Sequence, residues 1–96
     1  MSLRFEWIPE LVEKNRGKHG VEPEHVESAL LNTDPAPYIR RVQDDKYVAL
    51  AQVEGNGDYL HIVFCVAKPG LTCCISARVM TSKEKGEFRR RRAKKK

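Results

Sequence analysis

The sequence predicts an α+β fold: a short N-terminal strand, two helices, an antiparallel β-meander of three to four strands and a C-terminal helix. Two observations support this prediction. The middle of the chain alternates apolar and polar residues between short turn sequences, as the strands of a meander do. On either side of it, helix-start signals precede segments of helical pattern. The 96 residues fit one domain, and a hydrophobic content of 41% is sufficient for a core.

The N-terminal third combines one strand signal with two helix signals. Residues 5–8 alternate apolar and polar side chains, which predicts a short strand. Pro9 suits the first position of a helix because its missing N–H would be unpaired there anyway, and we expect this helix over residues 10–16. A second helix is expected from Pro23 to about Asn32, where apolar side chains recur at i, i+3 and i+4.

Strand-like segments follow, separated by turn sequences rich in Gly, Pro and Asp. In chain order they cover residues 38–42, 46–54, 59–67 and 71–80. The strongest turn signal is Gly55-Asn56-Gly57-Asp58, because these residues tolerate positive φ and favour a hairpin. Short loops between successive strands imply antiparallel pairing, and residues 38–42 would form an exposed edge that could pair with a partner.

A clear helix-start signal follows the last strand. Strict alternation along this strand turns every second side chain inward, namely Leu71, Cys73, Ile75, Ala77 and Val79. Thr81 and Glu84 then match a capping box, in which the hydroxyl and the carboxylate satisfy free helix donors reciprocally. We expect a helix from Ser82 to about Arg91, and helices covering one face of the sheet.

The formal net charge of +5 is concentrated at one end of the chain. Residues 89–96 hold seven cations and no anion, which leaves 11 basic and 13 acidic residues, a net charge of −2, in residues 1–88. This distribution excludes a globally basic coat for nucleic acid. We expect a single domain over residues 1–88 and a basic, disordered tail over residues 89–96, with RNA binding by the tail as the alternative.

Other features favour a cytoplasmic protein without membrane, metal or cofactor. No apolar run reaches the roughly 18–20 residues that span a bilayer, and no signal peptide is visible. Cys65, Cys73 and Cys74 are typical of a reducing compartment, and we expect all three thiols to pack as small apolar residues. No Cys-x-x-Cys occurs and the three histidines lack the spacing of metal ligands, so no metal site is expected.

Several basic residues remain as candidates for chemistry. Lys18 and His19 lie near the end of the first helix. Arg40 and Arg41 are adjacent, so they must point to opposite faces of their strand. We take Arg40, Arg41 and His61 as candidate substrate-binding residues.

Arg78 interrupts an otherwise apolar strand just before the capping box. It could make a surface ion pair with Glu84, or it could face a shallow basic site that stabilises a pentacoordinate phosphate without a metal. RNA cleavage by its own 2′-hydroxyl would need only such a site, a base and an acid. Composition and spacing alone do not choose between these interpretations.

Two motifs lie at opposite ends of the chain. The first motif is Phe5-Glu6-Trp7 followed by Asn15-x-x-Lys18-His19-Gly20-Val21. The second motif is Ile75-Ser76-Ala77-Arg78 followed by Thr81-x-x-Glu84. As an ordered pair, these motifs resemble the BrnT family of bacterial toxins. The strands between the motifs match in order and length, so the resemblance covers nearly the whole chain.

The resemblance implies a RelE-like fold and a type II toxin–antitoxin ribonuclease that inhibits translation by cutting RNA without a metal cofactor. It also implies a ribbon-helix-helix antitoxin as partner, whose complex with the toxin represses its own promoter, so that DNA is contacted only indirectly. By position it implies catalytic roles for Lys18, His19 and Arg78 and a supporting role for Glu84. His19 could instead hold the helix–loop junction by hydrogen bonding.

The chain departs from the family pattern at two places. Ile8-Pro9 stands where the family usually has an aspartate, and Phe88 stands where a tyrosine is common. If that phenol assists proton transfer in relatives, this chain lacks it. The alternative hypothesis is therefore a non-catalytic module of the same fold that binds an antitoxin-like protein or RNA.

Overall fold

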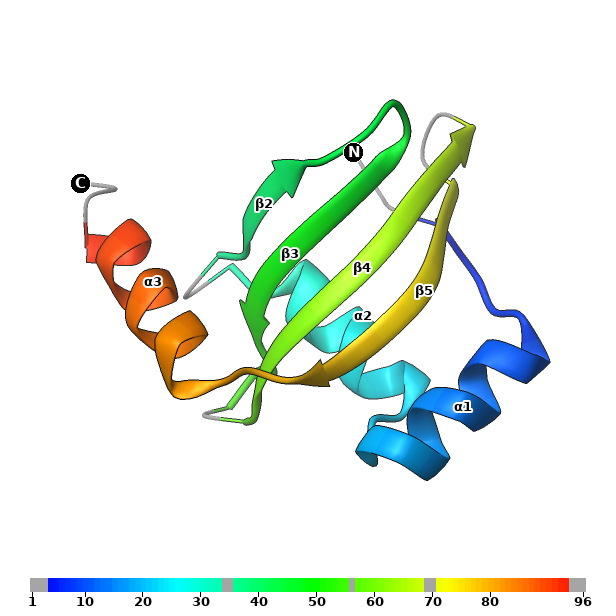
Figure 1. Cartoon of the computed structure of the whole chain (residues 1–96), viewed down its shortest axis with the longest axis horizontal. Coiled ribbons are helices and arrows are strands. Elements are labelled where there is room, and N and C mark those ends of the chain that lie inside the picture. Colours follow the sequence, from blue (N-terminus) through cyan, green and yellow to red (C-terminus); the bar gives the residue numbers. More distant parts are fainter. Residues whose placement is uncertain (1–3, 34–35, 56, 69–70, 94–96) are drawn as a thin grey trace.

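The structure is a computed structural model that describes residues 4–33, 36–55, 57–68 and 71–93, and these residues form a five-stranded sheet with three helices (Figure 1). In chain order the elements are β1 (Arg4–Glu6), α1 (Pro9–His19), α2 (Pro23–Leu31), β2 (Tyr38–Arg41), β3 (Lys46–Gln52), β4 (Tyr59–Lys68), β5 (Leu71–Val79) and α3 (Ser82–Ala93). The sheet order is β1-β5-β4-β3-β2, in which β2 to β5 form an antiparallel meander and β1 pairs in parallel with β5. The predicted α+β class and element order are confirmed.

Helix α1 ends three residues later than predicted. Gly17 lies inside the helix, and the chain leaves it at Gly20, whose φ of 67° is left-handed. The N–H of Gly20 donates to the carbonyl of Arg16 at 3.0 Å, which closes the helix. A residue without a Cβ adopts this φ at little cost, so Gly20 rather than Gly17 fixes the end of α1.

A buried amide attaches α1 to the sheet. Asn15 is 4% exposed, and its Oδ1 accepts a hydrogen bond from the N–H of Ala77 at 3.3 Å. Strand β1 pairs with β5 only from Leu71 to Cys73, so Ala77 lies on a stretch of β5 that β1 does not reach. Asn15 therefore satisfies a backbone donor at the edge of the sheet that would otherwise be buried without a partner.

Helices lie on both faces of the sheet, whereas the sequence pattern predicted helices on one face. Figure 1 shows α2 behind the strands and α3 beside β2 and β3. The α2 side buries a core of apolar residues, chiefly Val26, Ala29, Leu30, Ala49, Ala51, Leu60, Ile62 and Phe64. On the other side, Met80 and Phe88 pack on Leu50, with Tyr38 and Tyr59 against them. Because strand side chains alternate, Leu50 points away from α2, and α3 must lie on that second face to cover it.

A β-bulge in β5 shifts the pairing of this strand with β4. Val63 pairs with Ser76, but the next residue, Phe64, pairs with Cys74, so Ile75 is left without a partner of its own. An extra residue of this kind reverses the alternation of side chains on one side of the bulge. The first half of β5 therefore presents the opposite face from the one predicted by strict alternation.

The bulge corrects the predicted inward face of β5. Thr72 and Cys74 are almost fully buried, whereas Cys73, predicted to be inward, is only partly buried. Leu71 and Ile75, also predicted inward, are partly buried as well. Beyond the bulge, Ala77 is buried as predicted, but Val79 is 46% exposed because it ends the stretch of β5 that β1 leaves unpaired.

Helix α3 runs two residues further than predicted, so residues 89–93 are helical where a disordered tail was expected. The guanidinium of Arg89 lies 5.9 Å from the ring centre of Tyr59, and that of Arg91 lies 5.0 Å from the ring centre of Tyr38. These cation–π contacts hold the basic end of α3 beside the sheet. Residues 94–96 lie outside the described residues, and the division into a domain over 1–88 and a tail over 89–96 stays a prediction.

The predicted glycine-rich hairpin joins β3 to β4. Gly55 has a φ of 77°, and the N–H of Gly57 donates to the carbonyl of Val53 at 2.9 Å. A Cβ added at Gly57 would lie 2.5 Å from the Cβ of Val53. The close approach of Val53 therefore requires a glycine at position 57. Asn56, the residue before it, lies outside the described residues.

Gly57→Ala should lower the free energy of unfolding by about 1–3 kcal/mol, because its methyl group overlaps Val53 and the hairpin must shift. The matched control is Gly17→Ala, whose Cβ meets nothing within 4 Å inside α1. That variant should be more stable than the parent chain by roughly 0.5–1 kcal/mol. Urea unfolding measures both, and equal stability of the two variants would contradict the close approach at Gly57.

Candidate functional site

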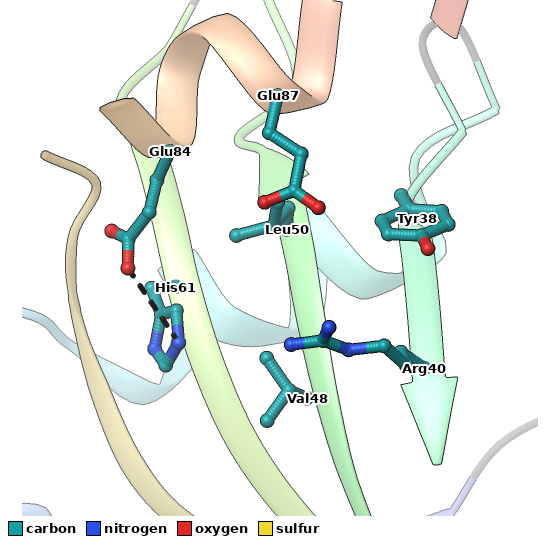
Figure 2. A pocket seen from close by; sticks show the side chains of 7 residues that line it. All are labelled: Tyr38, Arg40, Val48, Leu50, His61, Glu84 and Glu87. Atoms are coloured by element: carbon teal, nitrogen blue, oxygen red, sulfur yellow. Dashed lines mark ion pairs between the residues drawn. The ribbon is translucent and has the colours of Figure 1, made fainter. Parts of the chain in front are cut away.

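A pocket between α3 and the sheet gathers polar side chains from three elements over apolar side chains from a fourth. Figure 2 shows Arg40 of β2, His61 of β4 and two carboxylates of α3 pointing toward one another. The lining residues are Tyr38, Arg40, Val48, Leu50, His61, Glu84 and Glu87. An apolar floor from β3 thus lies under a rim of charged and titratable groups.

The strand register explains why these side chains meet. His61 lies directly opposite Leu50 on β3 and directly opposite Arg78 on β5. Residues that face each other across adjacent strands share one face of the sheet. Arg40 lies opposite Val48 and so shares this face, whereas its neighbour Arg41 points to the other face.

Arg78 and Glu84 form a bidentate ion pair beside the pocket. The Arg78 Nη1 and Nη2 donate to Glu84 Oε1 and Oε2 at 2.9 and 2.8 Å. Such a planar pair is among the stronger charge-assisted contacts. The pKa of Glu84 is lowered to about 2, chiefly by its hydrogen bonds with the Arg78 guanidinium. This carboxylate therefore stays ionised near neutral pH. The surface ion pair that the sequence allowed for Arg78 is present.

Glu84 also caps α3. Its Oε1 accepts the N–H of Thr81 at 2.9 Å, while the Thr81 hydroxyl oxygen accepts the N–H of Glu84 at 3.2 Å. The predicted capping box is therefore formed. One carboxylate thus fixes the start of α3 and the position of Arg78 together.

His61 lies inside the pocket with one ring nitrogen directed at Glu84. Its Nε2 is 3.9 Å from Glu84 Oε2, and its side chain is 20% exposed. Burial, followed by the positive charge of Arg78, lowers the pKa of His61 below 6.5, although Glu84 acts in the opposite direction. The imidazole is therefore neutral near pH 7 and can accept a proton.

The structure does not bring every predicted site residue to this pocket. Lys18 and His19 lie on the last turn of α1, where Lys18 is exposed and His19 is partly buried. Within the described part of the chain, no hydrogen bond or ion pair joins them to Arg78. The Nε of Arg41, on the opposite face of the sheet, donates to the carbonyl of Gln43 at 3.2 Å. Catalytic roles for Lys18 and His19 stay predictions.

Two polar residues of the pocket were not among the predicted site residues. Tyr38 lies two positions before Arg40 on β2, so strand alternation alone places both on the same face. Glu87 lies three positions after Glu84, which is the spacing of neighbours on one helix face. Both could have been predicted from the spacing of side chains on the same face, two residues apart on a strand and three apart on a helix.

Phe88 has a packing role. Its side chain is 1% exposed and meets the ring of Tyr59 edge to face, with ring centres 6.0 Å apart. This position belongs to the small core under α3 and does not line the pocket.

None of the helices within the described residues is long and apolar enough to span a membrane. The same residues contain no group of three or more His, Cys, Asp or Glu side chains arranged to hold a metal ion.

Comparison with known proteins identifies the fold. No protein-family model matches the chain, and no curated protein matches it by sequence. Among solved structures, the chain is similar to the ribonuclease toxin BrnT of Brucella abortus, with a TM-score of 0.67 and 18% sequence identity. The similarity covers 84% of this chain and 100% of that chain. The chain therefore has a BrnT-like fold, as its two motifs predicted.

The Arg78–Glu84 pair should make stability sensitive to acid. Because folding depresses the pKa of Glu84 from 4.5 to about 2, the contribution of the pair is complete above about pH 4.5 and is lost as the pH falls toward 2. Glu84→Gln keeps an oxygen that accepts the Thr81 N–H, yet it should lower the free energy of unfolding near pH 7 by about 1–2 kcal/mol. It should also flatten the decline between about pH 5 and pH 2.

Urea unfolding at a series of pH values measures this effect. The matched control is Glu13→Gln, because Glu13 pairs with Arg16 at 3.0 Å but its side chain is 73% exposed. An exposed pair of this kind contributes about 0–1 kcal/mol. An identical pH dependence in the parent chain and Glu84→Gln would exclude the Arg78–Glu84 pair as the acid-sensitive contact.

Proposed function

We propose that this chain is a cytoplasmic endoribonuclease toxin of a type II toxin–antitoxin system, which inhibits translation by cutting RNA. The observation that carries the proposal is the pocket with Arg40 and His61 in its lining, and Arg78 beside it on the same sheet face of a BrnT-like fold. The Brucella protein of the same fold is a ribonuclease toxin, which supports an RNA substrate and an antitoxin partner. The proposed antitoxin is a ribbon-helix-helix protein, through which the complex would contact DNA.

The proposed reaction uses the 2′-hydroxyl of the substrate as nucleophile and requires no metal or cofactor. His61 removes the proton of that hydroxyl, whose oxygen then attacks the neighbouring phosphorus. The bond to the 5′-oxygen breaks, and the departing oxygen takes a proton from water. Arg78 and Arg40 stabilise the extra negative charge on the pentacoordinate phosphate. The products are a 2′,3′-cyclic phosphate and a 5′-hydroxyl end.

The geometry favours His61 as the base over the residues that the family resemblance implied. His61 faces the pocket and lies directly opposite Arg78, the candidate phosphate ligand. Its lowered pKa keeps the imidazole neutral, which is the form that accepts a proton. His19 lies on α1 and lines no part of this pocket.

Glu84 has a supporting role in this proposal. Both terminal nitrogens of Arg78 bind Glu84 in the free chain. An incoming RNA phosphate must therefore share the guanidinium with Glu84 or displace it. The carboxylate holds Arg78 in place before substrate arrives, and it also competes with the substrate for the same donors.

A non-catalytic module that binds RNA or an antitoxin-like protein is the second candidate function. The Arg78–Glu84 pair favours it, because the best phosphate ligand is already engaged. Phe88 in place of a tyrosine was the other reason for this alternative. Phe88 is buried under α3, so its ring gives no evidence about chemistry in the pocket.

Purified protein should cleave RNA in the presence of EDTA and leave 2′,3′-cyclic phosphate ends. His61→Gln and Arg78→Lys should each lower kcat/KM by about 100-fold or more, since one removes the base and the other the planar donor pair. In the parent chain, kcat/KM should rise with pH through a pKa below 6.5, as expected for a base whose pKa is lowered. Capillary electrophoresis of end-labelled RNA measures the cleavage.

The same variants separate the alternatives. If RNA binds tightly and no cleavage products form, the chain is a binding module. If His19→Gln abolishes cleavage while His61→Gln preserves it, the base is His19, as the family resemblance implied. Expression without an antitoxin should arrest bacterial growth, and His61→Gln should relieve the arrest. If bacteria that express the parent chain without an antitoxin grow normally, the toxin proposal is wrong.

The exposed cations of α3 should supply the salt-sensitive part of RNA binding. Replacing Arg89 and Arg90 by Gln should reduce the slope of log K against log salt by up to about 1.4, at roughly 0.7 for each phosphate contact to a single strand. The control replaces Arg4 and Lys14, which are exposed on β1 and α1. Fluorescence anisotropy with 2′-O-methyl RNA, which cannot be cleaved, measures the slope. Equal slopes for the two double variants would exclude α3 as the principal contact.

A further inference from the structure

A row of four side chains crosses the sheet on the far side of the β5 bulge from the pocket. Lys46 of β3 lies opposite Cys65 of β4, Cys65 lies opposite Cys73 of β5, and Cys73 lies opposite Glu6 of β1. Directly paired residues share a face, so this row lies on the face that carries the pocket. Both thiols are free and partly exposed, and neither lines the pocket.

We propose that Cys65 and Cys73 form a redox-active dithiol site, which a small disulfide such as oxidised glutathione converts into a reversible cross-strand disulfide. The inference rests on strand pairing and exposure. It is independent of the proposed ribonuclease function, because no residue of the pocket takes part.

The backbone geometry fits a disulfide between these positions. Paired residues of an antiparallel ladder have Cα atoms about 4.5 or 5.5 Å apart, depending on whether they exchange hydrogen bonds. Disulfides connect Cα atoms roughly 4.4–6.8 Å apart, so both values are within range. The bulge at Ile75 creates the site, because it turns Cys73 away from the core and onto the face of Cys65.

Cys74 does not take part. Its side chain is 2% exposed and lies in the core under α2. Burial, followed by the charge of Cys73, raises the pKa of Cys74 to about 12, so its thiol does not ionise near neutral pH. The adjacent pair Cys73–Cys74 also points to opposite faces of β5, which removes it as a competing disulfide.

The raised pKa of Cys73 sets the order of the reaction. Burial, followed by the charges of Glu6 and Cys65, raises the pKa of Cys73, so the first attack is assigned to Cys65. The Cys65 thiolate attacks one sulfur of the glutathione disulfide and releases one glutathione. The Cys73 thiolate then attacks Cys65 Sγ in the mixed disulfide and releases the second glutathione. The two thiol protons end on the two released glutathione molecules.

Reduced full-length protein incubated with oxidised glutathione without air tests the site. Iodoacetamide added under denaturing conditions should then label one thiol of the three, whereas it labels three before oxidation. Intact mass should show no retained glutathione, and dithiothreitol should restore all labelling. A stable glutathione adduct, a covalent dimer on a non-reducing gel, or three labelled thiols after incubation would each overturn the proposal.

Single variants identify the pair. Cys73→Ser should accumulate one glutathione on Cys65, because no second thiol releases it. Cys65→Ser should lose the internal disulfide, and an internal disulfide that persists in it would assign the bridge to Cys73 and Cys74 and overturn the proposal. The matched control Cys74→Ala should still form the bridge. The two serine variants lie at partly exposed positions, so the test is complete even if the core substitution at Cys74 prevents folding.

Discussion

The ion pair between Arg78 and Glu84 is the contact on which the C-terminal part of the fold and the candidate site both depend. It joins the end of β5 to the first turn of α3, and the same carboxylate caps that helix through Thr81. With its first turn fixed, α3 brings Phe88 onto Leu50 and forms one wall of the pocket. Removing either partner would leave a partly buried charge unpaired. The resulting loss of folding free energy exceeds the free energy that an exposed ion pair contributes. Site geometry and helix docking are therefore coupled through one carboxylate.

The two motifs that carry the family resemblance meet in space. Asn15 of the first motif accepts a hydrogen bond from the N–H of Ala77 in the second, and Gly20 ends α1 with a left-handed φ. Val21 is buried in the core. Much of each motif is thus explained by docking α1 against the unpaired edge of β5, which is an architectural requirement of the fold. A motif residue therefore needs a place in or beside the pocket before it is assigned chemistry. Arg78 lies beside the pocket, opposite His61, whereas His19 lies on the last turn of α1.

The sequence was sufficient to predict features that depend on residues close together in the chain. The capping box follows from a spacing of three residues between Thr81 and Glu84, so both the helix start and the ion pair were within reach of sequence analysis. The bulge at Ile75 was not, because it is defined only by the register of β5 against β4. Of the three cysteines expected to be packed, Cys74 is buried, whereas Cys65 and Cys73 are partly buried, and Cys73 changes face at the bulge. Which of Arg40 and Arg41 faces the pocket likewise depended on pairing with β3.

The electrostatic balance of the pocket bears on the proposed binding of RNA. Arg40 in the pocket and Arg78 beside it are matched by Glu84 and Glu87, and residues 1–88 carry a net charge of −2, so the pocket has little attraction for a polyanion at a distance. In the proposed function, the attraction for RNA would come from the cations of α3, which continue past the residues that wall the pocket. Arg89 and Arg91 stack on Tyr59 and Tyr38, and Tyr38 also lines the pocket. The basic end of the helix therefore adjoins the pocket. In the proposed function, an RNA strand held by α3 would lie within reach of Arg78. An RNA phosphate would then compete with the Glu84 carboxylate for the Arg78 guanidinium.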